Sequence, residues 1–431
     1  MKKYKLGELL EVSRGASLKG DFYAASGKYI RLTCGNFDYR NNSFKENTSK
    51  DNLFYIGEFK AEFLLEKGDL ITPLTEQAIG LLGSTAWIPE SGKYIQSQDI
   101  AKITCKEELL DKKFAYYLIS SNMVKQQLSA AAQQTKIRHT SPDKIKDCTV
   151  WLPALEKQKQ IGQLLFDLDR KIELNRAINH NLEAMAKQFY DYWFVQFDFP
   201  DKNGKPYKSS GGKMVWNEKL KREIPEDWKV TQLGNLCSFR NGINYAKDEI
   251  GEPYAIVNVR NISATSILLD GEDFDVITIP LSKATNYILT EKDIVIARSG
   301  CPGSTRLLHT SNKTLFCGFI ICCTPIEEYL RNYITLFLKI LEGSSATTSG
   351  GSILQNVSQD TLKSLWIILP SIKLLMIFDR FLKDLIDLLY SNSMAIKILT
   401  KQRDELLPLL MNGQVKVGVE RSRLNYDLSN D

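Results

Sequence analysis

Polar and basic side chains that suit hydrogen bonding to nucleic acid gather in one loop of the second half of this sequence. The loop reads Ala297-Arg298-Ser299-Gly300-Cys301-Pro302-Gly303-Ser304-Thr305-Arg306. Small residues let a backbone approach phosphate groups, and arginine side chains reach guanine edges or phosphates. A counterpart in the first half lies at residues 72–77 and 83–85. The candidate contacts are Arg298, Ser299, Ser304, Thr305 and Arg306 in the second half, and Thr72, Gln77, Ser84 and Thr85 in the first.

A second polar loop follows an aromatic stretch in each half. The aromatic stretches, Phe114–Leu128 and Tyr329–Leu341, are each predicted to form a helix, and the loops follow at 133–139 and 344–352. Glutamine, arginine, serine and threonine hydrogen-bond base edges and phosphates, although an ordinary polar connection explains any single one of these residues equally well. The candidates are Gln133, Gln134, Lys136, Arg138 and His139, and Ser345, Thr347 and Ser349.

Motifs for catalysis and metal binding are missing from the sequence. It has no G-x-S-x-G and no H-E-x-x-H. Gly212-Lys213 resembles the end of a phosphate-binding loop, but Tyr207 and Met214 occupy two positions that the motif reserves for glycine and for serine or threonine. No two of the eight cysteines form a C-x-x-C pair, and there are three histidines. We therefore expect a binding protein without a metal or cofactor of its own; binding of S-adenosylmethionine by this chain alone would favour an enzyme.

The elements that carry the loops occur twice. The offset between matching segments stays near about 220 residues and drifts slowly, as small insertions between matching elements require. Four matches in the same order indicate a tandem duplication, and the two copies differ most in their polar loops. The matches are Leu6-Gly7-Glu8-Leu9 with Leu233-Gly234-Asn235-Leu236, residues 65–71 with 289–295, Gly83-Ser84-Thr85 with Gly303-Ser304-Thr305, and Leu152-Pro153 with Leu369-Pro370.

A long helix is predicted after each copy, from Ala154 to about Gln196 and from about Ser371 to Leu410. Apolar residues recur there at steps of three and four, the spacing of a coiled-coil seam. Asn175 and Asn392 interrupt the two seams near the middle of each helix. If the helices pack antiparallel, these asparagines approach each other and fix the register. The alternatives are that one or both face solvent, and that the coil serves dimerisation or scaffolding.

Together these features predict an α+β fold. Two strand-rich domains are joined by two long helices, which form an antiparallel coiled coil, pseudo-twofold from the tandem duplication, if they pack antiparallel. A helix of about forty residues is roughly 60 Å long at 1.5 Å per residue, enough to place two domains on successive major-groove faces of one duplex. Segment 199–213 is polar, basic and rich in turn residues, which predicts a mobile linker, and the linker as a whole is expected to extend to residue 223. The expected boundaries are 1–153 (domain 1), 154–198 (central helix), 199–223 (linker), 224–370 (domain 2), 371–415 (C-terminal helix) and 416–431 (tail).

Composition limits the class of protein. The formal net charge of +5, from 56 Lys+Arg against 51 Asp+Glu, permits a nucleic-acid partner without requiring one, because binding depends on a local patch. The scattered cysteines fit free thiols in a reducing compartment. The N-terminus has no apolar signal region, and the most apolar stretch, residues 365–378, is interrupted by Pro370 and Lys373. We therefore expect a cytoplasmic protein.

Four further segments form a specific combination. They are the Leu-Pro-x-x-Glu-x-Gln-x-x-Ile pattern at 152–161, Phe189-Tyr190-Asp191-Tyr192-Trp193-Phe194-Val195, Ile224-Pro225-Glu226-Asp227-Trp228 with Leu233-Gly234, and residues 406–415. Together with the duplication they cover nearly the whole chain, which resembles the specificity (S) subunit of type I restriction–modification systems.

The resemblance implies a non-catalytic subunit of a larger complex. Each recognition domain would read one half of a bipartite target in double-stranded DNA, and the helices would set the spacer. Two methyltransferase (M) subunits would dock on the helices, bind S-adenosylmethionine and methylate adenines. Two restriction (R) motor–nuclease subunits would use ATP and Mg to translocate and cut unmodified DNA.

The sequence departs from the family pattern at two places. The second helix opens Ile372-Lys373-Leu374-Leu375-Met376-Ile377, without the Glu and Gln of the first copy, so its coil contacts or its docking of a partner are expected to differ. Domain 1 also lacks the Ile-Pro-x-x-Trp opening of domain 2. The rival interpretation is a coiled-coil scaffold protein whose domains bind no specific DNA.

Overall fold

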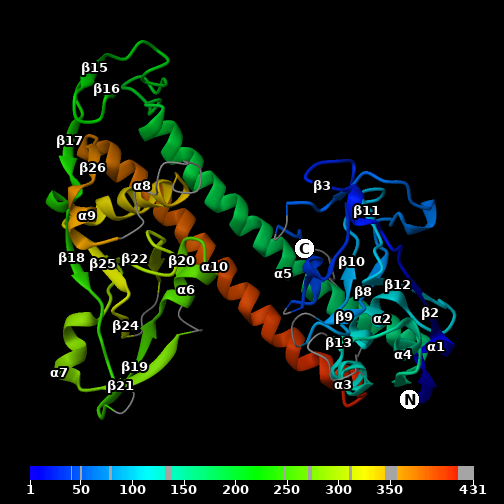
Figure 1. The fold of residues 1–431 in the computed structure, drawn as a ribbon. Helices are drawn as coiled ribbons and strands as arrows, with labels where there is room; N and C mark the ends of the chain where they lie inside the picture. The colour runs from blue at the N-terminus through cyan, green and yellow to red at the C-terminus, as the bar shows by residue number, and fades with distance from the viewer. Residues whose placement is uncertain are drawn as a thin grey trace, which may run out of the picture. The chain divides into compact units, whose positions relative to one another are not determined.

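The chain forms two compact units in the computed structural model, which describes residues 1–415 except 40, 49–50, 77–79, 132–137, 247–248, 270–273, 310–312 and 345–356. Unit 1 comprises Met1–Ile172 and Ile398–Asp431, and unit 2 comprises Glu173–Lys397. Each unit holds one strand-rich domain and part of both long helices, α5 (Leu155–Tyr190) and α10 (Ile372–Met411) (Figure 1).

Unit 1 builds recognition domain 1 around two four-stranded sheets. The first has the order β10 (Ala86–Trp87), β8 (Leu70–Pro73), β12 (Ile100–Cys105), β2 (Leu10–Arg14) and is antiparallel. The second has the order β11 (Tyr94–Ile95), β4 (Tyr29–Arg31), β7 (Phe54–Tyr55), β3 (Tyr23–Ala24), with β11 and β4 parallel. Two-stranded pairs complete the domain: β1 (Lys2–Lys5) with β14 (Thr149–Leu152), β5 (Phe37–Asp38) with β6 (Ser43–Phe44), and β9 (Thr75–Glu76) with β13 (Arg138–His139). Its helices are α1 (Leu6–Leu9), α2 (Lys112–Ile119), α3 (Asn122–Ala131) and α4 (Pro142–Lys146).

Unit 2 builds recognition domain 2 around a five-stranded sheet. Its order is β18 (Cys237–Asn241), β25 (Ile320–Pro325), β22 (Ile294–Ala297), β23 (Thr305–Leu308), β20 (Leu268–Leu269). A three-stranded sheet follows the order β21 (Asp275–Ile279), β19 (Glu252–Val257), β24 (Thr314–Phe316), and β17 (Lys229–Gln232) pairs with β26 (Trp366–Leu369). Its helices are α6 (Val259–Ala264), α7 (Leu281–Ala284), α8 (Arg331–Ser344) and α9 (Gln359–Ser364).

The strand order confirms the tandem duplication. The order β2-β12-β8-β10 of domain 1 returns as β18-β25-β22-β23 in domain 2. The antiparallel pair β1–β14 returns as β17–β26, and the parallel pair β4–β11 returns as β19–β24. The same topology in both halves makes the two domains copies of one unit, and this allows residues at equivalent places to be compared.

The single aromatic helix predicted at 114–128 is divided in two. Helix α2 ends at Ile119 and α3 begins at Asn122. The hydroxyl of Ser120 donates to the carbonyl of Tyr116, and that of Ser121 donates to the carbonyl of Leu118 at 2.6 Å. Serine side chains that hydrogen-bond nearby carbonyls compete with the helical backbone pattern. The prediction of helical structure at 114–128 was therefore right, but the prediction of one continuous helix was wrong. The second copy, α8, is a single helix.

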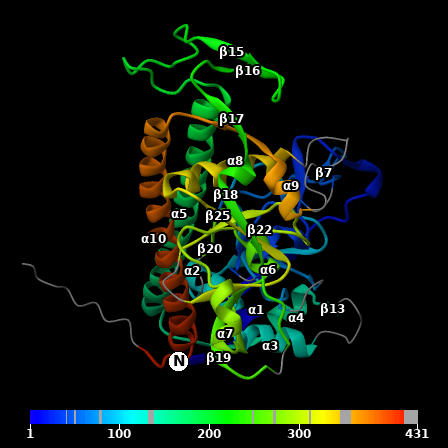
Figure 2. The same cartoon turned by 90° about the vertical axis from the view of Figure 1, so that its left-hand side faces the viewer.

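The two long helices match the predicted ranges and pack antiparallel in each unit. In unit 1 the start of α5, at Ile161 and Leu165, shares a core cluster with the end of α10, at Leu410 and Met411. In unit 2 the end of α5 meets the start of α10, where the ring of Phe189 lies 4.3 Å from that of Phe381. The two helices lie side by side in both views (Figures 1 and 2). Helix α5 continues as one π-helical turn, Asp191–Val195.

The altered opening of the second helix has a structural counterpart. In unit 1, Gln158 is buried, accepts a hydrogen bond from the Asp111 backbone N–H and donates to the carbonyls of Leu109 and Pro153. Helix α5 begins at residue 155 and α10 at 372, an offset of 217, which makes Leu375 the counterpart of Gln158. Leu375 is fully buried in the apolar core of unit 2. Apolar packing therefore replaces a polar anchor at this junction.

The polar contact between the helices in unit 2 involves different residues from those predicted. Asn179 Nδ2 donates to Ser393 Oγ at 3.1 Å, whereas no hydrogen bond joins Asn175 to Asn392 in the described part of the chain. The cross-helix bond thus lies one helical turn beyond Asn175, since four residues advance about one turn. The Nδ2 of Asn392 is buried and has no hydrogen-bond partner among the described residues.

Replacing Asn392 with leucine is expected to raise the melting temperature. A buried donor without a partner costs about 1–3 kcal/mol, and leucine has a similar volume. A gain of 1 kcal/mol corresponds to a rise of about 2–4 °C for a unit of this size, measurable by differential scanning calorimetry. Asn179→Leu is the comparison variant, because it removes the existing bond to Ser393 together with an Oδ1 that is unpaired within the described ranges, and should therefore raise the melting temperature less than Asn392→Leu. An unchanged or lower value for Asn392→Leu would contradict the assignment.

Segment 199–223 is folded, so the prediction of a mobile linker was wrong. The ring of Phe199 stacks on Tyr207 and on Trp228, with centroids 4.7 Å apart in both pairs. The carboxylate of Asp198 accepts bonds from the backbone N–H and hydroxyl of Ser209. Strands β15 (Met214–Asn217) and β16 (Arg222–Pro225) pair as a hairpin. The composition correctly predicted turns, but it did not indicate that Phe199, Tyr207 and Trp228 would stack and stabilise them.

Candidate nucleic-acid interface

Three chain segments of recognition domain 2 meet at one edge of the five-stranded sheet. They are residues 242–245 after β18, the loop 298–304 between β22 and β23, and the turn 317–319 between β24 and β25. The backbone N–H of Arg298 donates to the carbonyl of Phe319 at 2.9 Å, and a β-bridge joins Ile243 to Cys317. We call these three segments edge 2.

Two glycines allow the segments of edge 2 to approach each other. A Cβ atom at Gly242 would lie 2.0 Å from the carbonyl oxygen of Cys317, and one at Gly318 would lie 2.1 Å from Oδ1 of Asn244. Because the contact at Gly242 is with backbone, a larger residue there would separate the segments, whereas at Gly318 the exposed Asn244 side chain would have to rotate away. Edge 2 is a tightly joined backbone frame, and its exposed side chains are Asn244, Tyr245, Arg298, Ser299 and Phe319.

Recognition domain 1 has the same frame at the same place, which we call edge 1. It comprises residues 14–18, 74–76 and 96–99, together with β13. The backbone N–H of Leu74 donates to the carbonyl of Asp99 at 2.7 Å, as that of Arg298 does to Phe319. A bridge joins Ala16 to Ser97, as Ile243 is joined to Cys317.

Four of the predicted DNA-contacting residues lie at these edges and reach the surface. Arg298 and Ser299 are exposed on edge 2. On edge 1, His139 is exposed and Arg138 is half-buried. Arg138 lies 3.6 Å from the carboxylate of Glu76 and donates to Ser129 Oγ, and Nδ1 of His139 lies 3.3 Å from Thr75 Oγ1. Their role as DNA contacts stays a prediction.

Six predicted contacts are buried in this structure, which argues against their binding DNA. Thr72 Oγ1 donates to the carbonyl of Ser84, and Thr85 Oγ1 donates to that of Tyr116. Arg306 is 4% exposed and donates to the backbone carbonyls of Ile262 and Thr265. Small polar residues satisfy buried backbone groups as readily as they contact DNA, and sequence does not distinguish the two roles. The six are Thr72, Ser84, Thr85, Ser304, Thr305 and Arg306.

The remaining predicted contacts lie outside the described residues. They are Gln77, Gln133, Gln134, Lys136, Ser345, Thr347 and Ser349.

The turn before β12 in recognition domain 1 and the turn before β25 in recognition domain 2 were not singled out from the sequence. Gln98 and Asp99 on edge 1, and Asn244, Tyr245 and Phe319 on edge 2, were not among the candidates. Asp99 and Phe319 align at an offset of 220 residues, because β12 begins at Ile100 and β25 at Ile320, whereas Asn244 and Tyr245 follow β18. The drift of the repeat offset could have revealed the equivalence of the two turns, but no shared residue type marks them.

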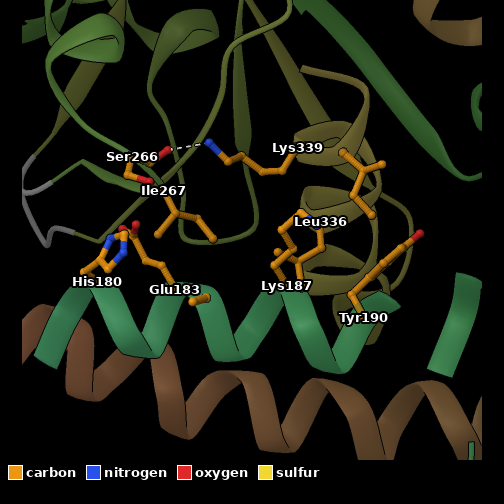
Figure 3. Close-up of a pocket in the computed structure, with 10 residues that line it drawn as sticks. His180, Glu183, Lys187, Tyr190, Ser266, Ile267, Leu336 and Lys339 are labelled. Atoms are coloured by element: carbon orange, nitrogen blue, oxygen red, sulfur yellow. Dashed lines mark hydrogen bonds between the residues drawn. The ribbon is translucent and has the colours of Figure 1, made fainter. Parts of the chain in front are cut away.

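A cavity of about 310 Å³ separates α5 from recognition domain 2 inside unit 2 (Figure 3). His180, Glu183 and Lys187 on α5 line one wall, and Leu336 and Lys339 lie opposite. Burial lowers the pKa of Lys339, whose Nζ donates to the carbonyl of Ser266 at 2.8 Å and to the carboxylate of Glu342. The lysine charge is therefore engaged within the wall, and the cavity is a gap in helix packing rather than an assembled catalytic centre.

Other kinds of site receive no support from the described residues. No three His, Cys, Asp or Glu side chains among them gather closely enough to hold a metal ion. Within the same ranges, the helices all fall short of the length and apolar content that crossing a membrane requires. The histidines occupy separate environments: His309 packs on the ring of Tyr390, while His139 lies at edge 1 and His180 at the cavity.

The chain shares its sequence pattern with curated specificity subunits. It is 22% identical over 471 residues to the type I restriction enzyme HindI specificity subunit of Haemophilus influenzae, covering 96% of this chain and 99% of that protein. It is 23% identical over 311 residues to the MjaIX specificity subunit of Methanocaldococcus jannaschii, covering 70% of this chain and 69% of that protein.

A solved structure and a family model agree with these relatives. The S subunit of a type I restriction–modification system from M. genitalium matches over 95% of both chains with a TM-score of 0.58 at 15% identity, which supports the fold. The model of the type I restriction modification DNA specificity domain matches twice, at residues 1–184 and 225–392. Since these matches include well over half of the 431 residues, the chain belongs to the type I restriction–modification DNA specificity family, whose function is the recognition of DNA sequence.

Proposed function

We propose that each recognition domain reads one half of a bipartite target in double-stranded DNA and that α5 and α10 set the spacer between the halves. One observation carries the proposal: edge 1 and edge 2 share a backbone frame but bear different side chains. Leu74 and Asp99 in one copy stand where Arg298 and Phe319 stand in the other. Two copies of one reader with different contacting residues fit two different half-sites.

The catalytic work is assigned to partner subunits. Two methyltransferase subunits would bind S-adenosylmethionine and modify adenines, and two restriction subunits would use ATP and Mg. The exposed face of α5 supports such docking, because Ile178, Met185 and Tyr192 recur every seven residues in unit 2 and are each about 40% exposed. A groove at the end of the helix is lined by Phe189, Tyr192 and Trp193. Exposed apolar stripes of this kind mark protein interfaces.

Modified-base sequencing tests the function. DNA from cells that co-express this chain with the methyltransferase subunit of its own system is compared with DNA from cells that express the methyltransferase alone. A split methyladenine motif found only with this chain is the expected result. If no motif appears while the methyltransferase still co-purifies with the chain, the scaffold interpretation gains and the bipartite-reader proposal fails.

A further inference from the structure

We propose that the residue at the tip of one equivalent turn, Asp99 in recognition domain 1 and Phe319 in recognition domain 2, determines the base that each domain accepts at one position. The inference rests on the proposed function and assigns it to particular side chains. Phe319 would contact the methyl group of a thymine, and Asp99 would accept a hydrogen bond from an exocyclic amino group such as cytosine N4.

The two residues occupy the same place in the duplicated frame. Each directly precedes an inner strand of its main sheet, β12 or β25. The carbonyl of Asp99 accepts a hydrogen bond of 2.7 Å from the backbone N–H of Leu74, the residue after β8. The carbonyl of Phe319 accepts one of 2.9 Å from the backbone N–H of Arg298, the residue after β22. The frame thus fixes the backbone and leaves the side chain free to differ. A position of this kind can change specificity without changing the fold.

Phe319 is presented to solvent on a rigid support. Its side chain is 64% exposed, although Ile320, the next residue, is fully buried in the core. The turn is tied to its neighbours by the bond from Arg298 N–H to the Phe319 carbonyl and by the bridge between Ile243 and Cys317. Exposed Arg298 follows the adjoining strand. An apolar ring beside a guanidinium suits a thymine methyl next to a guanine edge or a phosphate.

Asp99 is instead held in a polar network. Its Oδ1 accepts a hydrogen bond from Thr75 Oγ1 at 3.3 Å, and Thr75 in turn lies 3.3 Å from Nδ1 of His139. The side chain is half-buried, which limits its rotation while leaving part of the carboxylate accessible. The exposed amide of Gln98 precedes it, at the position of Gly318 in the other copy. Acceptors positioned in this way suit the amino groups of the major groove.

The test measures the methylated motif for single variants of the full chain in complex with its methyltransferase. Phe319→Ala is expected to relax the preference at one position of one half-site by about tenfold, the effect of losing a small apolar contact. Phe319→Leu should retain the preference. Asp99→Asn should change the preferred base at one position of the other half-site, by about five- to 150-fold.

Two controls use the far ends of the same strands. Ile326, directly after β25, is 63% exposed, so Ile326→Ala removes a comparably exposed apolar side chain. Glu107, which is exposed shortly after β12, provides Glu107→Gln. Both should leave the motif unchanged.

The outcomes separate this inference from the proposed function. No split motif for the unaltered chain would overturn the proposed function itself. A normal split motif for the unaltered chain that persists unchanged in Phe319→Ala and Asp99→Asn would overturn this assignment alone. Relaxation that also occurs in the control variants would overturn it as well, because the effect would then not belong to the turns.

Discussion

Replacing Arg306 with methionine is expected to destabilise unit 2 by about 3–5 kcal/mol, the cost of removing one partner from a buried ion pair. Nε of Arg306 donates to the carbonyls of Ile262 and Thr265, and its NH1 group lies 3.1 Å from the carboxylate of Glu342. Methionine keeps much of the side-chain volume but removes the donor to the two carbonyls and leaves Glu342 with its bonds from Lys339 and the Thr305 N–H, so the effect reports the lost polar contacts.

Urea unfolding combined with hydrogen exchange of peptides around β22 and β23 measures this change and locates it in unit 2. Arg298→Met is the matched control, because Arg298 is exposed and its loss should alter stability by no more than about 0.5 kcal/mol. Equal losses for the two variants would contradict the assigned roles. The pair also separates the two arginines of one loop into a structural residue and a candidate DNA contact.

The same network makes unit 2 sensitive to acid. Burial raises the pKa of Glu342, but Arg306 and Lys339 outweigh this and hold it below the ordinary value. A carboxyl whose pKa is lowered by folding contributes stability above its unfolded pKa of about 4.3, and this contribution disappears as the pH falls through the folded value. Arg306→Met should therefore show a smaller loss of stability than the unaltered chain between about pH 5 and pH 3.

The large-scale organisation was predictable because it rests on repeated patterns. The duplication, the long helices and their antiparallel packing follow from periodicity, which many residues determine jointly. Ile161 and Leu165 on α5, and Phe378 and Leu382 on α10, are apolar residues at the spacing that the predicted seams require, and all four are buried. An error at one of these positions would not have changed the conclusion.

The candidate site was harder to predict because it depends on individual residues. Arg298 and Arg306 share one loop, and only the fold shows that one is exposed and the other is buried against Glu342. Phe319 carries no polar group and so gave no signal for binding. The linker was expected to be mobile, since the stacking of Phe199 on Tyr207 and on Trp228 joins residues that are distant along the chain. Such tertiary contacts override composition.

The largest effect in unit 1 is expected from Arg403→Met. NH1 of Arg403 lies 2.8 Å from Oδ1 of Asp169, and Oδ2 of Asp169 accepts a hydrogen bond of 2.6 Å from Tyr117 Oη. The three residues connect α10, α5 and α2. Burial and the neighbouring carboxylate raise the pKa of Tyr117, which stays a donor at neutral pH. Removing the arginine leaves Asp169 without its charge partner, at a cost of about 3–5 kcal/mol.

The other half of the chain supplies the design for a rescue. At the offset of 217 residues, Ile386 stands in place of Asp169 and Ala186 in place of Arg403, and both are buried in unit 2. A triple variant, Asp169→Ile with Arg403→Ala and Tyr117→Phe, copies this apolar solution and removes the hydroxyl that would lose its acceptor. Replacing a whole buried polar network is often neutral, whereas breaking it is costly.

We therefore expect thermal unfolding to give different melting temperatures for the single and the triple variant at this site. Arg403→Met should lower the melting temperature sharply, and the triple variant should recover most of the loss. A triple variant as unstable as the single one would mean that the polar network stabilises unit 1 in a way that the apolar pair does not reproduce. Recovery would mean that the network mainly distinguishes the helix junction of unit 1 from that of unit 2. One copy has a charged pair and the other an apolar pair, and exchanging a helix between them would leave a buried charge unpaired.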